Sequence, residues 1–360
     1  MIIILQTDLP TISPDLKELL AWLDAHDGVQ TRVYSYEGQQ HRVTEVHVLG
    51  PATGIDSRAL LAMPVVSQIV EVAPKLASIA PVPSGSGGFE YMGLRFDQDA
   101  MHIFPGIRAV TDPSDALETF AAIAAAGVPT AHAGVFAPRQ RLHDAPSVGV
   151  AGLENVLVGA GEHGLRVVCV PVYGVAQLEA LRACCEVLGT DAPGVLVKVE
   201  GRDIELLEAV GAQRDFPVLY QRGPHQGLEQ AMETCAEVAA GGNRHIMLGL
   251  AGVNGPQAGG HVWTGDFGSI AAVKRATRLP VAVDASAIVG GRWLAHDGFG
   301  DVHHMTAQGV IAGANMVFVD VHPSPGRAGA QALGLEALGL YLEDVCLVRE
   351  AYLNRRRLLE

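Results

Sequence analysis

The sequence predicts an α/β protein, a (β/α)8 barrel preceded by a small ferredoxin-like βαββαβ domain, and three observations support this fold class. Eight apolar runs that end in polar or glycine residues follow one another after residue 100. Ala-rich amphipathic segments separate these runs, as expected of alternating parallel strands and helices. No Gly-x-Gly-x-x-Gly motif follows the first strand, which favours a closed barrel over an open nucleotide-binding sheet.

The first 73 residues have the order strand, helix, strand, strand, helix, strand, the pattern of a ferredoxin-like sandwich. The first helix carries apolar residues at i, i+3, i+4 and i+7 from Leu16, with Ser13 as its N-cap. The unit contains no catalytic constellation, so an effector-sensing, an oligomer-building and a purely structural role all stay open. We expect strands at Ile2–Leu5, Gln30–Tyr36, Arg42–Leu49 and Val66–Val72, and helices at Pro14–His26 and Ser57–Leu61.

A segment rich in Pro, Gly and Ser, Pro81–Gly88, has the composition of a linker. The sequence therefore predicts a ferredoxin-like domain over residues 1–78, a linker over 79–95 and the barrel over 96–360. The barrel strands are expected at Met101–Pro105, Val128–Ala133, Arg166–Tyr173, Gly194–Glu200, Pro217–Gly223, His245–Gly252, Leu279–Asp284 and Met316–His322. The helices are expected at Asp115–Ala126, Val175–Val187, Asp203–Val210, Leu228–Ala239, Ser269–Ala276 and Leu333–Arg355.

Composition excludes several classes of partner. A net charge of −14 with no basic run argues against binding to nucleic acid or to an acidic membrane surface.

The N-terminus lacks a signal-peptide pattern and no apolar run approaches about 18 residues, so we expect a cytoplasmic protein. The five cysteines show no C-x-x-C spacing, which favours buried free thiols over disulfides or a zinc site.

Four motifs in order along the chain resemble the 3-deoxy-7-phosphoheptulonate (DAHP) synthase family, in the subgroup with an N-terminal regulatory domain. They are Phe136-Ala137-Pro138-Arg139, Pro217–Gly223 (PVLYQRG), Pro280–Ser286 (PVAVDAS) and Val319–Pro323 (VDVHP). The resemblance covers essentially the whole chain. It implies condensation of phosphoenolpyruvate with erythrose 4-phosphate on a divalent metal, and assembly of a tetramer, so we expect a homodimer or homotetramer.

The metal-binding positions of that family are substituted here. The family's Gly-Pro-Cys is Gly106-Ile107-Arg108, its Asp-Pro-Ser-His is Asp284–Ala287, and its last acidic ligand falls near Gln331. The family's glutamate ligand is replaced by Asp320, which alone keeps a side chain of the right chemistry. One carboxylate opposed by an arginine is not a credible site for a hard divalent ion. We therefore expect no metal and no other cofactor.

The substrate-binding positions also differ. The family's Lys-Pro-Arg keeps only Arg139, the lysine before Arg-Gly is Gln221, and Glu-Arg-Gly-Ile-Arg becomes Leu250–Asn254. Two guanidinium groups that would hold phosphate and carboxylate are thus absent, and Asn or Ala cannot replace bidentate recognition by Arg. We predict that the chain has no DAHP synthase activity.

Polar residues at the strand ends form the pool of candidate site residues, because barrel enzymes draw their catalytic groups from several strand ends. We expect catalytic roles for Lys198, Asp284, Asp320 and His322. We expect substrate-binding roles for Arg108, His132, Arg139, Gln221, Arg222, Asn254 and Ser286. Tyr173 and Glu200 belong to the same pool of strand-end residues without an assigned role.

Lys198 interrupts an apolar strand, and two orientations stay open. If it faces the lumen, desolvation lowers the pKa of its ammonium group and permits a Schiff base. If the pleat turns it outward, Val197 and Val199 fill the lumen instead. Asp320 and His322 share a face of one strand, as a proton-transfer pair or as mutual hydrogen-bond partners. Asp284 either orients a ligand hydroxyl or satisfies backbone donors.

Arg108, Arg139 and Arg222 are expected to form a pocket for a small anionic substrate, the alternative being surface salt bridges. The spacing of His303-His304 does not support joint metal ligation. The glycine-rich loop Ala251–Trp263 is expected to act as a lid or ligand contact, with Trp263 closing over an apolar ligand.

Two classes of function follow. The first is a metal-independent enzyme acting on a small carboxylated or phosphorylated carbonyl compound, in a shikimate-related or specialised pathway, with lyase or aldol-type chemistry. The second is a non-catalytic ligand-binding or regulatory relative of DAHP synthase. The polar barrel mouth favours the enzyme.

Overall fold

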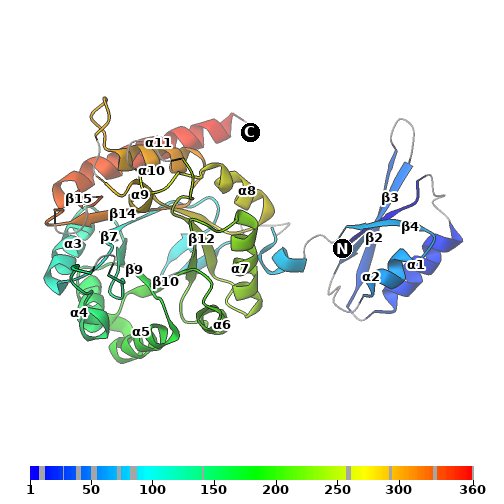
Figure 1. The fold of residues 1–360 in the computed structure, drawn as a ribbon, viewed down its shortest axis with the longest axis horizontal. Coiled ribbons are helices and arrows are strands. Elements are labelled where there is room, and N and C mark those ends of the chain that lie inside the picture. The colour runs from blue at the N-terminus through cyan, green and yellow to red at the C-terminus, as the bar shows by residue number, and fades with distance from the viewer. Residues whose placement is uncertain are drawn as a thin grey trace. The chain divides into compact units, whose positions relative to one another are not determined.

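The structure is a computed structural model, shown in Figure 1, and it divides into two compact units, Met1–Ala77 and Ser78–Glu360. It describes residues 1–7, 13–26, 28–37, 42–49, 55–70, 74–81, 87–139, 142–256, 261–291, 294–326 and 331–358. Parts of three predicted features lie outside these ranges: residues 71–72 of the fourth strand, 82–86 of the linker and 257–260 of the glycine-rich loop.

The first unit is a four-stranded antiparallel sheet with two helices, in the strand order β2-β3-β1-β4 of a ferredoxin-like sandwich. Ser13 caps the first helix by accepting a hydrogen bond from the Asp15 amide, and Leu19 and Leu23 bury the predicted apolar stripe. The predicted fold of this unit is confirmed. Its elements are β1 (Ile2–Leu5), α1 (Pro14–Asp24), β2 (Gln30–Glu37), β3 (Arg42–Leu49), α2 (Ser57–Leu61) and β4 (Val66–Val70).

The second unit is a closed barrel of eight parallel strands, confirming the predicted fold class. The strands follow chain order around the barrel, and the pairs β13–β14 and β14–β7 complete the ring. The two-residue strand β15 (Leu333–Gly334) adds to β14 on the outside of this order. The barrel strands are β7 (His102–Ile107), β8 (Thr130–Ala133), β9 (Val167–Pro171), β10 (Gly194–Glu200), β11 (Val218–Arg222), β12 (Ile246–Leu250), β13 (Val281–Asp284) and β14 (Met316–His322).

Helices surround the strands, as Figure 1 shows. The C-terminal helix begins at Leu338 instead of the expected Leu333, because Leu333 and Gly334 pair with β14. The helices are α3 (Pro113–Ala125), α4 (Gly149–Glu162), α5 (Val175–Leu188), α6 (Ile204–Ala212), α7 (Leu228–Ala240), α8 (Gly268–Ala276), α9 (Ala285–Val289), α10 (Asp301–Ile311) and α11 (Leu338–Arg357), with 3-10 turns η1 (Pro74–Ile79), η2 (Gly189–Asp191) and η3 (Leu335–Ala337). Within the described ranges, no helix is both long enough and apolar enough to cross a membrane.

The segment expected to be a linker, residues 79–95, is largely part of the barrel unit. It contains most of a hairpin of β5 (Phe89–Tyr91) and β6 (Leu94–Phe96). Phe89 and Phe96 are buried in the same apolar cluster as the barrel strands. Burial of these two aromatic rings stabilises the packing of the hairpin against the barrel, which a solvated linker would not do. The barrel unit therefore begins at Ser78 and not at residue 96.

The apolar cluster inside the barrel also determines which strand residues face the lumen. It includes Leu196, Ala282 and Phe318. Because side chains alternate along a strand, the residue two positions later faces the same way. Lys198, Asp284 and Asp320 therefore point into the carboxyl end of the lumen, and Lys198 has the inward of its two possible orientations.

Candidate functional site

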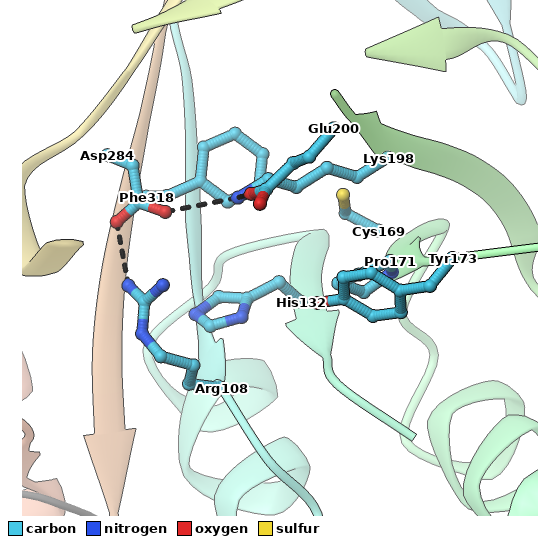
Figure 2. Close-up of a pocket in the computed structure, with 9 residues that line it drawn as sticks. All are labelled: Arg108, His132, Cys169, Pro171, Tyr173, Lys198, Glu200, Asp284 and Phe318. Carbon is cyan, nitrogen blue, oxygen red and sulfur yellow. Dashed lines mark hydrogen bonds and ion pairs between the residues drawn. The ribbon is translucent and has the colours of Figure 1, made fainter. Parts of the chain in front are cut away.

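A pocket at the carboxyl end of the barrel strands brings several of the predicted residues together, as Figure 2 shows. Its cavity volume is about 40 Å³, a few times the minimum for one water molecule, so it suits a small chemical group. Arg108, His132, Lys198 and Asp284 were all expected in the site. The full lining is Arg108, His132, Cys169, Pro171, Tyr173, Lys198, Glu200, Asp284 and Phe318.

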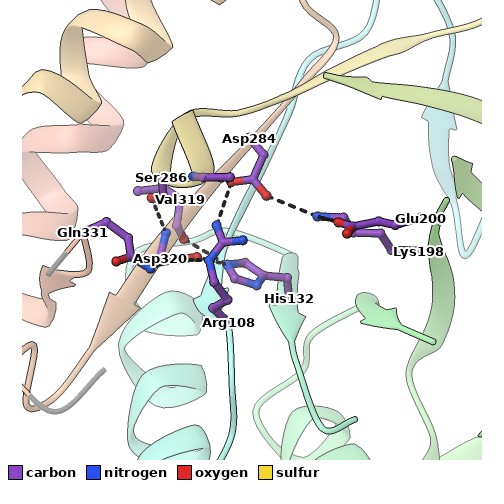
Figure 3. A network of polar contacts seen from close by, with 10 residues as sticks. Arg108, His132, Lys198, Glu200, Asp284, Ser286, Val319, Asp320 and Gln331 are labelled. Carbon is purple, nitrogen blue, oxygen red and sulfur yellow. Dashed lines mark hydrogen bonds and ion pairs between the residues drawn. The ribbon is translucent and has the colours of Figure 1, made fainter. Parts of the chain in front are cut away.

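Arg108 is the centre of the charged network shown in Figure 3. Its Nη2 donates to Asp284 Oδ1 at 2.8 Å and its Nε donates to Asp320 Oδ2 at 2.7 Å. Burial alone would lower the pKa of Arg108, but the two carboxylates outweigh it and raise the pKa. Gly106 permits this arrangement, since a Cβ there would lie 1.9 Å from the His132 carbonyl oxygen. The guanidinium thus bridges two buried carboxylates.

Asp284 is held by two cations and by the start of α9. Its Oδ2 lies 3.2 Å from Lys198 Nζ, and its Oδ1 also accepts a hydrogen bond from the Ala287 amide at 3.0 Å. Burial raises the pKa of Asp284, but Arg108 and Lys198 outweigh it and hold the pKa well below its ordinary range. The carboxylate satisfies a backbone donor, as one of its two expected roles requires, and it also lines the pocket; its role toward a ligand stays a prediction.

Lys198 is buried and protonated. Its Nζ lies 3.5 Å from Glu200 Oε1 and 5.7 Å from the centre of the Phe318 ring. Burial lowers its pKa, but Asp284 and Glu200 outweigh that cost and raise the pKa above the ordinary value. The expectation of a lowered pKa is wrong, because a carboxylate on each side compensates the desolvation. A cationic proton donor fits this geometry better than a Schiff-base amine.

Asp320 and Ser286 lie behind the pocket lining. Asp320 Oδ2 accepts a hydrogen bond from Gln331 Nε2 at 3.1 Å, and the Asp320 backbone amide donates one to Ser286 Oγ at 2.9 Å. Asp320 Oδ1 is buried and has no hydrogen-bond partner within the described ranges. It lies 3.5 Å from His132 Nε2, which is also 3.1 Å from the Val319 carbonyl oxygen.

The expected three-arginine pocket is not assembled, because the arginines are engaged or apart. Arg222 donates to Asp266 Oδ2 at 2.6 Å and to the Gln226 carbonyl at 2.8 Å. Burial raises the pKa of Asp266, but Ser269 and Arg222 outweigh it and lower the pKa. Arg139 is exposed on the loop after β8. Only Arg108 lines the pocket, and its charge is matched within the chain.

The remaining candidates lie outside the pocket lining. His322 Nδ1 accepts the Ser324 amide at 2.9 Å, and its Nε2 is 3.5 Å from Asp115. Asn254 is exposed, with its backbone amide donating to the Pro224 carbonyl. Gln221 is buried, and its Nε2 has no hydrogen-bond partner among the described residues.

Neither the histidine pair nor Trp263 of the glycine-rich loop lines the pocket. His303 packs against Tyr341, and His304 lies 3.3 Å from Asp297. No three His, Cys, Asp or Glu side chains are grouped to hold a metal in the part of the chain that the structure describes. Trp263 does not line the pocket; its backbone amide donates to the Ile288 carbonyl.

Sequence reasoning missed three lining residues, Cys169, Pro171 and Phe318. Cys169 and Pro171 lie in β9 and alternate with their neighbours in step with Tyr173, which follows the strand. An inward-facing Tyr173 would therefore have predicted that both line the pocket. Burial raises the pKa of Cys169 to about 12, so the thiol is protonated and is not a nucleophile.

Comparison with known proteins extends these observations. No protein-family model matches the chain. The phospho-2-dehydro-3-deoxyheptonate aldolase of Thermotoga maritima is 25% identical over 238 residues, which are 65% of this chain and 66% of that protein, slightly under two thirds of its length. A crystal structure described as phospho-2-dehydro-3-deoxyheptonate aldolase (DAHP synthase) from T. maritima matches with a TM-score of 0.68 and 19% identity, over 97% of both chains.

The chain has the fold of DAHP synthase. A truncated form of the 3-deoxy-D-arabino-heptulosonate 7-phosphate synthase from T. maritima also matches, with a TM-score of 0.64 and 19% identity over 77% of this chain and 97% of that one. The DAHP-synthase-like scaffold therefore includes the N-terminal unit as well as the barrel.

Proposed function

We propose that the chain is an enzyme on a DAHP-synthase-like scaffold that acts on a small carboxylated or phosphorylated carbonyl compound without a divalent metal. The observation that carries the proposal is the guanidinium of Arg108 between the carboxylates of Asp284 and Asp320. A built-in cation there does part of what a bound metal ion would do. It is the positive partner of both carboxylates and occupies the place between them.

The donor set does not fit a divalent ion. Both carboxylates already accept hydrogen bonds from Arg108, and Lys198 adds a second positive charge 3.2 Å from Asp284. A divalent ion between these carboxylates would have to displace the Arg108 guanidinium from its hydrogen bonds, and it would be repelled by Lys198. We therefore derive no step through a metal.

The pocket supports chemistry on a carbonyl group. Lys198 is the cation that a ligand can reach. One of its two carboxylate partners, Glu200, has a side chain that is 46% exposed and can give up its place beside the ammonium group. A ligand carbonyl oxygen or carboxylate competes with Glu200 for the ammonium group. The formal charges of Arg108 and Lys198 against those of Asp284, Asp320 and Glu200 leave no positive surplus. The pocket therefore favours a singly charged or neutral reacting group.

The small size of the cavity supports the second candidate, a non-catalytic ligand-binding or regulatory relative of DAHP synthase. In that case the Arg108 network only stabilises the barrel after loss of the metal. The two candidates differ in turnover and not in binding.

The experiment is a thermal-shift screen of chelator-treated protein against phosphoenolpyruvate, pyruvate, sugar phosphates, shikimate, chorismate and prephenate, with and without Mn²⁺. A ligand that binds the native state raises the melting temperature as its concentration exceeds the dissociation constant. We expect a shift that is independent of Mn²⁺. A shift that requires Mn²⁺, or DAHP formation from phosphoenolpyruvate and erythrose 4-phosphate with Mn²⁺, would contradict the proposal.

A further inference from the structure

We propose that the pocket catalyses removal of a proton from the carbon next to a ligand carbonyl, with His132 Nδ1 as the base and the Lys198 ammonium group as the partner of the carbonyl oxygen. This inference rests on the proposed function, because it needs a small carbonyl compound in the pocket. It assigns a reaction to the site and a catalytic role to His132.

The hydrogen bond of His132 determines which ring nitrogen is free. Its Nε2 lies 3.1 Å from the Val319 carbonyl oxygen, and a carbonyl oxygen can only accept. The proton of the neutral ring is therefore on Nε2, and Nδ1 carries a lone pair. Nδ1 makes no hydrogen bond within the described part of the chain, while the ring lines the pocket, as Figure 2 shows. An unprotonated nitrogen facing a cavity is the group that a general base requires.

The surroundings keep this ring neutral. Burial and the positive charge of Arg108 lower the pKa of His132, and Asp320 and Asp284 oppose them without reversing the direction. The other groups lining the pocket around it are Cys169, Tyr173, Lys198, Glu200 and Phe318. Near neutral pH the imidazole is therefore ready to accept a proton.

Asp320 explains how the ring can hold that proton. Asp320 Oδ1 is buried without a hydrogen-bond partner and lies 3.5 Å from His132 Nε2. Buried carboxylate oxygens normally have partners, so this exception calls for a role. When Nδ1 takes up a proton, the ring becomes positively charged at short range from the Asp320 carboxylate. Asp320 is thus a positioning residue that stabilises the charge which develops during the reaction.

His132 and Lys198 can serve the two ends of one small ligand. They belong to β8 and β10, which are separated by β9, so their strands are about 10 Å apart. Figure 2 shows both side chains at the same pocket. A ligand of a few heavy atoms can place a C–H bond near Nδ1 and its carbonyl oxygen near Nζ.

The step balances without an oxidant or reductant. The proton moves from carbon to Nδ1, and the C–H electron pair becomes a carbon–carbon double bond. The carbonyl π electrons move to oxygen, which takes a hydrogen bond or a proton from Lys198. Reversal returns a proton to carbon, so the protein exchanges this hydrogen with solvent.

The test is hydrogen–deuterium exchange in D₂O, followed by proton NMR, with pyruvate and dihydroxyacetone phosphate as probes and a chelator present. We expect exchange above the buffer rate for at least one probe. His132→Gln keeps a donor near the Val319 carbonyl but removes the base, so exchange should fall by roughly 10²–10⁴-fold. Added imidazole should partly restore exchange in His132→Ala. His163→Gln at the end of α4 is the matched control and should exchange normally.

Each result decides a different point. Undiminished exchange in His132→Gln would overturn the base assignment and leave the proposed function intact. A probe that binds in the thermal-shift screen but does not exchange in the wild type would overturn the proton abstraction. Absence of any ligand in that screen would overturn both proposals. Nitrogen NMR of the His132 ring gives a test without a ligand, because a proton on Nδ1 instead of Nε2 would also contradict the inference.

Discussion

Arg108 and Arg222 stand at strand ends of the same barrel and were both expected to hold an anion, yet their surroundings differ. Arg108 bridges two almost fully buried carboxylates beside a lysine, whereas Arg222 pairs with one carboxylate, Asp266, that is 30% exposed. An arginine at a strand end therefore does not by itself indicate an anion site. The carboxylates that the fold brings to it determine whether its charge is available to a ligand.

The largest expected effect is the difference in free energy of unfolding when one carboxylate is removed from each of these two networks. Asp284→Ala removes the carboxylate shared by Arg108 and Lys198 and leaves buried positive charge, so it should reduce the free energy of unfolding by about 3–5 kcal/mol. Asp266→Ala should cost only about 1–2 kcal/mol, because its pair is partly solvated. Urea denaturation of both variants measures the difference. Equal losses would show that burial does not distinguish the networks.

Removing the built-in cation should create metal affinity. Arg108→Ala leaves Asp284 and Asp320 facing each other without their shared guanidinium, and hard divalent ions favour such oxygen ligands. We expect Mn²⁺ to raise the melting temperature of this variant by several degrees and to leave the wild type unchanged. Arg222→Ala serves as the control, since its loss exposes no second carboxylate. A response of the wild type equal to that of Arg108→Ala would count against a guanidinium in the role of a metal.

Acid stability should depend on Asp284. Its pKa is lowered in the folded state, so its contribution is present above its unfolded pKa of about 3.9 and is lost as the pH falls through the folded value. Asp284→Asn lacks this contribution. The stability gap between wild type and variant should therefore shrink as the pH falls below about 4. Chemical denaturation at a series of pH values measures the gap, and a gap that stays constant would contradict the assignment.

The smallest expected effect concerns Arg139. This residue is exposed, so Arg139→Ala should change the free energy of unfolding by no more than about 0.5 kcal/mol. If the arginine contacts a ligand, the variant should weaken binding of any phosphorylated hit from the thermal-shift screen while its melting temperature without ligand is unchanged. A large loss of stability would instead indicate a structural role for Arg139.

The sequence predicted the barrel because strand and helix patterns are local. The Val281–Val283 run, for example, is apolar throughout, preceded by Pro280 and followed by Asp284, as expected of a buried parallel strand. The sequence did not predict the hairpin around Phe89 and Phe96, because the Pro-, Gly- and Ser-rich segment before it has the composition of a linker. Its strands are three residues each, too short for a clear alternation.

For the site, the sequence determined which residue types occur at the strand ends, including the arginine directly after β7 and the lysine inside β10. Only the tertiary structure decided their chemistry. The direction of the Lys198 pKa shift depends on Asp284, which is 86 residues away in the chain, and the charge of Arg108 is matched by Asp284 and Asp320, 176 and 212 residues away. Local patterns report periodicity, whereas pKa values and charge balance depend on distances of a few ångströms between residues that only the closed barrel brings together.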